Sequence, residues 1–349
     1  MFDHLKYLIS FFFPACVAWF LITGPHDALT ALLWTVPLWT MILIDWLSPK
    51  INPNYSKNII SNWFYDAILY GLSCFQFLII VLLLNYASQL QWESLQQIVE
   101  SLINLIVLRI LVGTTSGSSA IIVAHELIHR PQIHMRFLGR LLLHTVCYEH
   151  FVIAHIRGHH LTVATPEDIE TAQLGESFNN YWKRVYKQHF NFAWNCEIER
   201  LGLNNSPVYH YKMLANTVLQ GMFVEFLMLI LIVIYFGWVA LFIFLFQALS
   251  AVRLLQTINY YQHWGLEQGK SVNTLAWVNQ SSFTEYALVG LSNHIEHHRN
   301  SKICYQNIAY SNHGPKMPYG YFVTNLWVKL RNKSYCQRST QVINSFFNQ

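Results

Sequence analysis

The chain has 349 residues, of which 53% are hydrophobic and only 11% are charged, against roughly 25% charged in a typical soluble domain. Too little charge is available to cover a soluble globule, and the apolar content is too high for a disordered chain, so both classes are excluded. The net charge of +4 is small and no nucleic-acid motif is present, so we expect no nucleic-acid partner. The class that these exclusions leave is the integral membrane protein. The chain also contains 17 histidines.

A helix that crosses a bilayer needs about 20 mostly apolar residues. Six such segments follow one another along the chain, at approximately 5–23, 28–47, 63–86, 97–121, 214–236 and 238–258. We therefore expect an all-α, polytopic membrane protein with six transmembrane helices. The stretches 122–213 and 259–349 contain most of the histidines and no internal repeat, so residues 1–349 are interpreted as one domain with a histidine-rich cap formed by these two stretches.

The positions of the basic residues predict the orientation of these segments. If the N-terminus is cytoplasmic, the outer loops are 24–27, 87–96 and residue 237, and they contain no Lys or Arg. Arg109 and Arg253 fall within apolar segments. All other Lys and Arg residues, Lys57 and Lys270 among them, then lie on the cytoplasmic side. We expect a multi-pass protein of the inner (cytoplasmic) membrane with both termini and the cap in the cytoplasm. Arg109 should pair with Glu225 or Asp66.

Four clusters of histidine follow the fourth and sixth apolar segments. A spacing of four residues places two side chains on the same face of a helix, and this spacing relates His125 to His129 and His155 to His159. His160 is adjacent to His159, His263 follows the sixth segment, and the last cluster has the spacing i, i+3, i+4. The nine clustered imidazoles belong to His125, His129, His155, His159, His160, His263, His294, His297 and His298.

Imidazole is a ligand for iron, zinc, copper and nickel. Nine imidazoles exceed the needs of one ion, so the sequence predicts two metal ions. All four clusters flank apolar segments on one side of the predicted membrane, and they can therefore converge on one site at the end of the bundle.

The first cluster also permits two other metal sites. His125-Glu126-Leu127-Ile128-His129 matches the H-E-x-x-H pattern of zinc proteases, in which Glu126 would be the general base. That interpretation leaves about six clustered histidines unexplained. Glu126 and His129 also imitate half of a soluble di-iron carboxylate site, but no second E-x-x-H motif accompanies them.

Four motifs together resemble the membrane-bound alkane hydroxylase (alkane 1-monooxygenase) family, within the membrane fatty-acid desaturase and hydroxylase superfamily. The order, spacing and six-segment layout agree over essentially the whole chain. The motifs are His125-Glu-Leu-Ile-His-Arg130, His155-Ile-Arg-Gly-His-His160 continuing into Val163-Ala-Thr-Pro-Glu-Asp168, Asn259-Tyr-Tyr-Gln-His-Trp-Gly-Leu266, and Leu291-Ser-Asn-His-Ile-Glu-His-His298.

The resemblance implies a non-haem di-iron monooxygenase that uses O2 and two external electrons. Such an enzyme hydroxylates an apolar alkyl chain, here the terminal carbon of an n-alkane, and the nine clustered histidines are its iron ligands. A membrane fatty-acid or lipid desaturase or hydroxylase is the alternative, and the zinc protease is a more distant one.

The resemblance also implies partners and supporting residues. The sequence has no C-x-x-C motif, so electrons should come from a rubredoxin or ferredoxin with its reductase. Membrane lipid and the alkyl substrate complete the expected partners. Glu126, Asp168, Asn259 and Glu296 are candidates to hold the imidazole N–H groups of the ligands.

Overall fold

The computed structural model describes residues 3–52, 60–267 and 274–348, so Lys57 and Lys270 lie outside the described residues. Helices form the whole framework of the described part of the chain. Extended pairing there is limited to two isolated bridges, between Lys50 and Ser281 and between Val278 and Lys316. The expected all-α fold is confirmed.

Five continuous helical segments are long and apolar enough to cross a membrane. The first two are short helices in series, and the fourth passes through a π-helical turn, η2. The segments are α1–η1–α2 (Asp3–Lys6, Tyr7–Phe11, Phe12–Thr23), α3–α4 (Ala28–Leu33, Val36–Leu47), α5 (Asn62–Ser88), α6–η2–α7 (Leu95–Thr115, Ser116–Ile121, Ile122–Ile128) and α12 (Thr217–His263).

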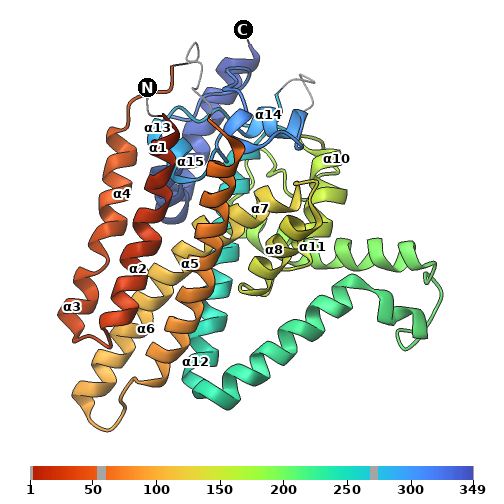
Figure 1. The fold of residues 1–349 in the computed structure, drawn as a ribbon. Coiled ribbons are helices and arrows are strands. Elements are labelled where there is room, and N and C mark those ends of the chain that lie inside the picture. Colours follow the sequence, from red (N-terminus) through yellow and green to blue (C-terminus); the bar gives the residue numbers. More distant parts are fainter. Residues whose placement is uncertain (1–2, 53–59, 268–273, 349) are drawn as a thin grey trace.

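The fifth segment contains both apolar stretches that were expected to be separate spans. Helix α12 runs from Thr217 to His263, and its course changes at Gly237, which has a φ of 82°. This conformation is open to glycine at little cost and unfavourable for other residues. Figure 1 shows the result, in which the first half of α12 slopes in from the side to the lower end of the bundle and the second half runs up along the bundle.

The second half of α12 packs against α5 and α6 at the centre of the molecule. Close approach to α6 depends on Gly113, where an added Cβ would lie 2.6 Å from the Cβ of Ser250. Arg109, one turn earlier, donates from Nε to Ser250 Oγ at 3.0 Å. The prediction that Arg109 pairs with Glu225 or Asp66 is wrong. Asp66 pairs with Arg130 at 3.4 Å, and Glu225 pairs with His144 at 3.3 Å.

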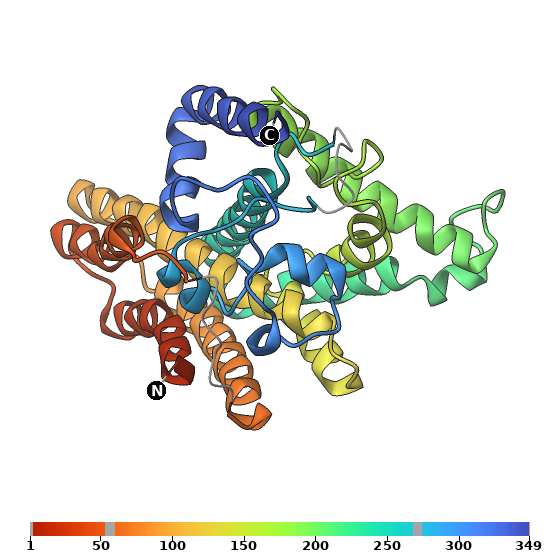
Figure 2. The same cartoon turned by 90° about the horizontal axis from the view of Figure 1, so that it is seen from above.

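The remaining elements lie beside and above one end of the long helices (Figure 1). Seen from above, the segments before residue 121 occupy one side of the molecule and α8 and α11 the other (Figure 2). These elements are α8 (Ile133–His144), α9 (Phe151–Ile153), η3 (Ala154–His159), α10 (His160–Thr162), α11 (Phe178–Leu201), η4 (Tyr211–Ala215), α13 (Ser282–Ala287), α14 (His294–Arg299), η5 (Tyr305–Asn307) and α15 (Tyr321–Phe347).

Candidate metal centre

The structure brings together all nine clustered histidines. His125 lies on α7 and His129 ends that helix, while His263 is the last residue of α12. The second cluster lies on η3 and α10, and the last cluster lies on the short helix α14. Two apolar helices therefore deliver histidines from the bundle, and three short helical elements, η3, α10 and α14, deliver the rest.

The second cluster is arranged differently from the sequence expectation. In an α-helix His155 and His159 would share a face, but η3 is a π-helix, in which hydrogen bonds span five residues. The Nε2 atoms of His155 and His160 consequently lie 3.0 Å apart. His159 instead contacts His263 and His298, with ring centroids 4.8 and 4.7 Å away. The π-helical turn thus divides three sequential histidines between two places.

The nine imidazoles form two groups, and within each group the candidate ligand atoms lie within 4.8 Å of one another. The two groups adjoin, because the ring of His160 lies 4.7 Å from that of His298. One group contains His125, His129, His155, His160 and His297, and the other contains His159, His263, His294 and His298.

Both groups have the donor atoms that a metal ion requires. In the second group His294 Nε2 lies 3.2 Å from His263 Nε2 and 3.0 Å from His298 Nε2, so the ring nitrogens of three imidazoles face one another. Buried polar atoms without a partner are costly, and a bound cation would satisfy those in this centre. Within the described part of the chain, buried nitrogens without a hydrogen-bond partner include Nε2 of His125, His129, His159 and His297.

Burial also keeps most of these imidazoles neutral. Loss of solvent, followed by repulsion from neighbouring imidazoles, lowers the pKa of His160 to about 2 and that of His129 to about 3. The same two causes lower the pKa values of His155, His294, His297 and His298 well below the ordinary value. The neutral form carries the lone pair that binds a metal, so the pocket is prepared for ligation at neutral pH.

His159 is the exception, because a carboxylate faces it. Burial alone would lower the pKa of His159, but the charges of Asp168 and Glu170 and the hydrogen bond to Asp168 raise it to about 9. The Nδ1 atom lies 2.9 Å from Asp168 Oδ2, which also accepts from Thr171 Oγ1 at 2.6 Å. This contact keeps the proton on Nδ1 and leaves Nε2 directed to the other imidazoles.

Glu170 is a functional candidate that the sequence analysis missed. Its Oε1 atom lies 3.2 Å from Nε2 of His189 and 3.8 Å from Nδ1 of His155, and Asn259 donates to its Oε2. All four side chains are buried. The sequence could have pointed to Glu170 through its position, two residues after Asp168 and directly after the second histidine motif.

The four supporting candidates are used in different ways. Asp168 contacts a clustered histidine directly, and Asn259 acts through Glu170. Glu126 instead pairs with Arg130 at 2.9 Å and accepts from the backbone N–H of Tyr305. Glu296 pairs with Arg299 on the outer side of α14, so its carboxylate is directed to a cation and not to an imidazole.

A backbone carbonyl supplies a further support. His263 Nδ1 lies 3.0 Å from the carbonyl oxygen of Leu275, which places the N–H on that side of the ring. A sequence motif cannot reveal this contact, because the acceptor is a main-chain oxygen, 12 residues further along the chain.

Comparison with known proteins places this centre in a family. Residues 101–324 match the family model described as fatty acid desaturase. The chain is 36% identical over 217 residues to alkane 1-monooxygenase 1 of Pseudomonas aeruginosa, covering 60% of this chain and 56% of that protein. It is 30% identical over 248 residues to alkane 1-monooxygenase of Acinetobacter baylyi, covering 67% and 60%.

A third relative is the hydroxylase component of a xylene/toluene monooxygenase of Pseudomonas putida, 26% identical over 208 residues, or 58% of this chain and 55% of that protein. In all three comparisons the match spans little more than half the length of the relative. The family match covers more than half of this chain and all four histidine motifs. The chain therefore belongs to the fatty acid desaturase family, and among its members it is similar to the alkane 1-monooxygenases.

Proposed function

We propose that the protein is a non-haem di-iron monooxygenase that hydroxylates the terminal carbon of an n-alkane or a similar apolar chain. The observation that carries this proposal is the pair of adjoining groups, five and four buried or half-buried imidazoles, at the ends of apolar helices. We assign one iron ion to each group, with the nine clustered histidines as the ligands. Similarity to alkane 1-monooxygenases supports the choice of substrate.

When bound, the two irons would supply the redox chemistry by which O2, two electrons and two protons convert a C–H bond into an alcohol and release one water molecule. The protein's own residues prepare the site for this. Asp168 and the Leu275 carbonyl hold Nδ1 protons on His159 and His263, so that both rings present Nε2 to the centre. The carboxylate of Glu170 faces His155 at 3.8 Å without a hydrogen bond, and burial keeps bulk water from the ligand nitrogens.

The side of the centre next to α7 is apolar. A void of about 10 Å³ adjoins His125 and His297, and Ile122, Leu291 and Ile308 are among its lining residues. An alkyl chain is far larger than this void, so the reacting end of the substrate requires these side chains to move apart. The apolar part of this wall favours a hydrocarbon chain, and the Glu126 carboxylate, which also lines the void, is already paired with Arg130.

For the membrane arrangement we propose six crossings in the inner membrane, with the two halves of α12 as separate crossings joined at Gly237. Both termini and the histidine-bearing cap would then be cytoplasmic, in one domain. Electrons would reach the centre from a rubredoxin or ferredoxin and its reductase. The excess of Lys and Arg on the predicted cytoplasmic side suits an acidic carrier.

A desaturase would use the same ligands, so the products must distinguish the two reactions. The purified protein is supplied with rubredoxin, its reductase, NADH and an n-alkane under ¹⁸O2. We expect a primary alcohol that carries one ¹⁸O atom, and about two irons per chain. An alkene without label would overturn hydroxylation in favour of desaturation.

A zinc protease is disfavoured by the contacts of Glu126, which would have to serve as its general base. This carboxylate is occupied by Arg130 and the Tyr305 N–H. Active protein with one zinc, no iron and no use of O2 would nevertheless overturn the di-iron proposal.

A further inference from the structure

Four arginines line a pocket that lies outside the metal centre. The pocket has a volume of about 360 Å³ and is formed by α8, η3, α11 and the first residue of α12. Its lining residues include Arg136, Arg140, Arg157 and Arg200, with Glu197 as the acidic member. Apolar side chains such as Ile128 and Ile153 form the rest of its wall.

Two of the arginines are neutralised by buried carboxylates. Arg200 makes two contacts with Glu197, at 2.9 and 2.7 Å, and the backbone N–H of Thr217 donates to the same carboxylate. Burial would raise the pKa of Glu197, but these hydrogen bonds lower it to about 2, so the carboxylate is charged. Arg140 is paired in the same way with Glu149, at 2.6 and 2.7 Å.

The other two arginines keep an unmatched positive charge at the mouth of the pocket. Arg136 donates to the carbonyl oxygens of Arg130 and Pro131, which carry no net charge. Arg157 reaches Glu197 only at 3.9 Å, and that carboxylate is already held by Arg200. Both side chains are exposed. The pocket therefore has room for an anion and two guanidinium groups available to bind it.

The surroundings of the mouth are those of a membrane surface. On α8, Ile133 and Phe137 form an exposed apolar stripe, 77% and 61% accessible, beside the stripe of Arg136 and Arg140. Thr217 belongs to the pocket and also begins α12. From there the first half of α12, which stands apart from the bundle at its start (Figure 1), has exposed apolar side chains, including Phe223, Phe226 and Ile230.

We propose that this pocket binds the phosphate of an anionic phospholipid, with the acyl chains lying along the first half of α12. Guanidinium groups bind phosphate oxygens in pairs of hydrogen bonds, and basic pockets on the cytoplasmic side of membrane helices suit anionic head groups. An acidic protein would match the charge but would leave the apolar stripe and the apolar face of α12 unused. The occupant is therefore a lipid of the surrounding membrane.

The test measures lipid retention by native mass spectrometry of the detergent-purified full chain, titrated with phosphatidylglycerol, with phosphatidylcholine or with inorganic phosphate. We expect one phosphatidylglycerol molecule to be retained preferentially over phosphatidylcholine, and free phosphate not to compete at equal concentration. Arg136→Gln with Arg157→Gln should weaken this binding about tenfold or more. Arg136→Gln alone, which changes no residue of the four histidine motifs, should weaken it severalfold.

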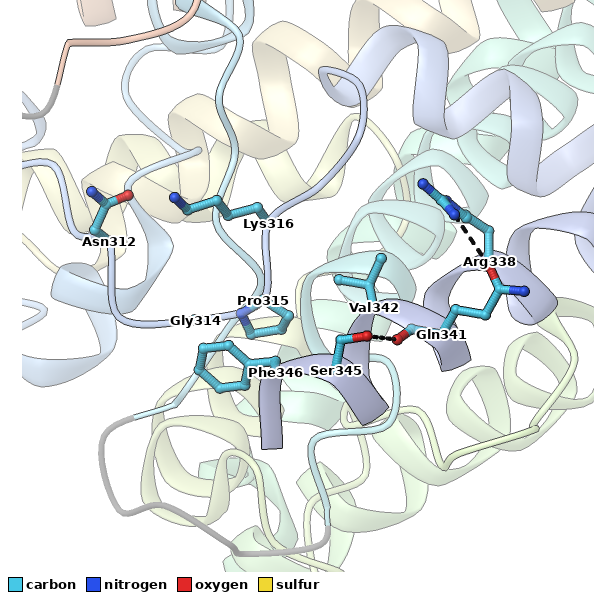
Figure 3. Close-up of a pocket in the computed structure, with 9 residues that line it drawn as sticks. All are labelled: Asn312, Gly314, Pro315, Lys316, Arg338, Gln341, Val342, Ser345 and Phe346. Atoms are coloured by element: carbon cyan, nitrogen blue, oxygen red, sulfur yellow. Dashed lines mark hydrogen bonds between the residues drawn. The ribbon is translucent and has the colours of Figure 1, made fainter. Parts of the chain in front are cut away.

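Arg338→Gln is the matched control, because Arg338 is an exposed arginine in a different pocket, which Lys316 also lines (Figure 3). Its removal should leave lipid retention unchanged, and circular dichroism should show that all variants are folded. Equal retention of the two lipids, or equal weakening by Arg338→Gln, would overturn the proposal. Competition by free phosphate alone, without lipid preference, would overturn it in favour of a simple anion site. Loss of hydroxylase activity has no bearing on any of these outcomes.

Discussion

The Nδ1 atom of His159 lies 2.9 Å from the Oδ2 atom of Asp168, and both side chains are almost fully buried. A third residue, Thr171, donates to the same carboxylate oxygen and fixes its position. Carboxylates that hold the far nitrogen of a ligand imidazole fix its tautomer and raise its basicity. The contact therefore connects the loop after the second histidine motif to the four-histidine group.

Asp168→Asn should weaken metal binding in that group. The amide removes the negative charge that raises the pKa of His159 and cannot hold the Nδ1 proton in the same way. We expect metal affinity to fall about 10- to 100-fold, as is typical when such a partner is lost. Iron retained during dialysis against graded chelator concentrations measures the change.

Glu167→Gln is the control for this experiment, since it removes the neighbouring carboxylate, which is exposed. Its iron retention should equal that of the unmodified protein. If Asp168→Asn also retained iron like the unmodified protein, the supporting role of Asp168 would be refuted.

The division into two groups predicts the metal stoichiometry of single variants. His263→Ala leaves three imidazoles in its group, and His129→Ala leaves four in the other. Each should reduce the iron content from two to about one per chain, and Mössbauer spectra of the two proteins should differ because different irons remain. His313→Ala, which changes an exposed histidine, should retain both. Identical spectra from the two variants would contradict the division.

Much of this arrangement could be predicted from sequence, because side-chain spacing and apolar length are local properties. Eight of the nine histidines are marked by their close spacing and His263 by its position after the sixth apolar segment, and the structure brings them together. The π-helical turn at Ala154–His159 was not foreseen, since its five-residue hydrogen bonds leave no mark in the spacing. The bend of α12 was marked by Gly237, but sequence could not tell a bend from a loop.

The supporting residues show a second limit of sequence reasoning. Glu126 and Glu296 were plausible because they lie inside histidine motifs, but Arg130 and Arg299 follow them by four and three residues. Such neighbours on a helix form ion pairs, and this is how both carboxylates are used. Glu170 was missed because its contacts with His155 and His189 depend on tertiary packing.

His150 should make the stability of the protein sensitive to acid. Burial, and then the nearby His189, lower the pKa of His150 from 6.5 to about 3, so the folded protein keeps this imidazole neutral. The unfolded chain takes up a proton below pH 6.5 and the folded chain does not, so stability falls as the pH drops from about 6.5 toward 3. The effect is absent above pH 6.5.

His150→Phe keeps a planar ring against Tyr148 and Phe190 and removes this titration. Thermal unfolding of the variant and the unmodified protein is compared at pH 8, 6.5 and 5. The difference in melting temperature, variant minus unmodified, should grow as the pH falls. His313→Phe serves as the exposed control. A constant difference from pH 8 to pH 5 for His150→Phe would show that His150 does not contribute.

Gly320→Ala should destabilise the connection between the second apolar segment and the C-terminal region. The Cβ of alanine would overlap the carboxylate of Asp45, which is buried at the end of α4 and accepts hydrogen bonds from Ser281, Thr284 and the N–H of Val323. We expect a loss of about 1–3 kcal/mol, as for other overpacked sites, seen as a lower melting temperature. Because the cause is overlap with one side chain, the same substitution should cost much less in an Asp45→Ala background. Equal losses in the two backgrounds would place the cause in the glycine backbone and not in its contact with Asp45.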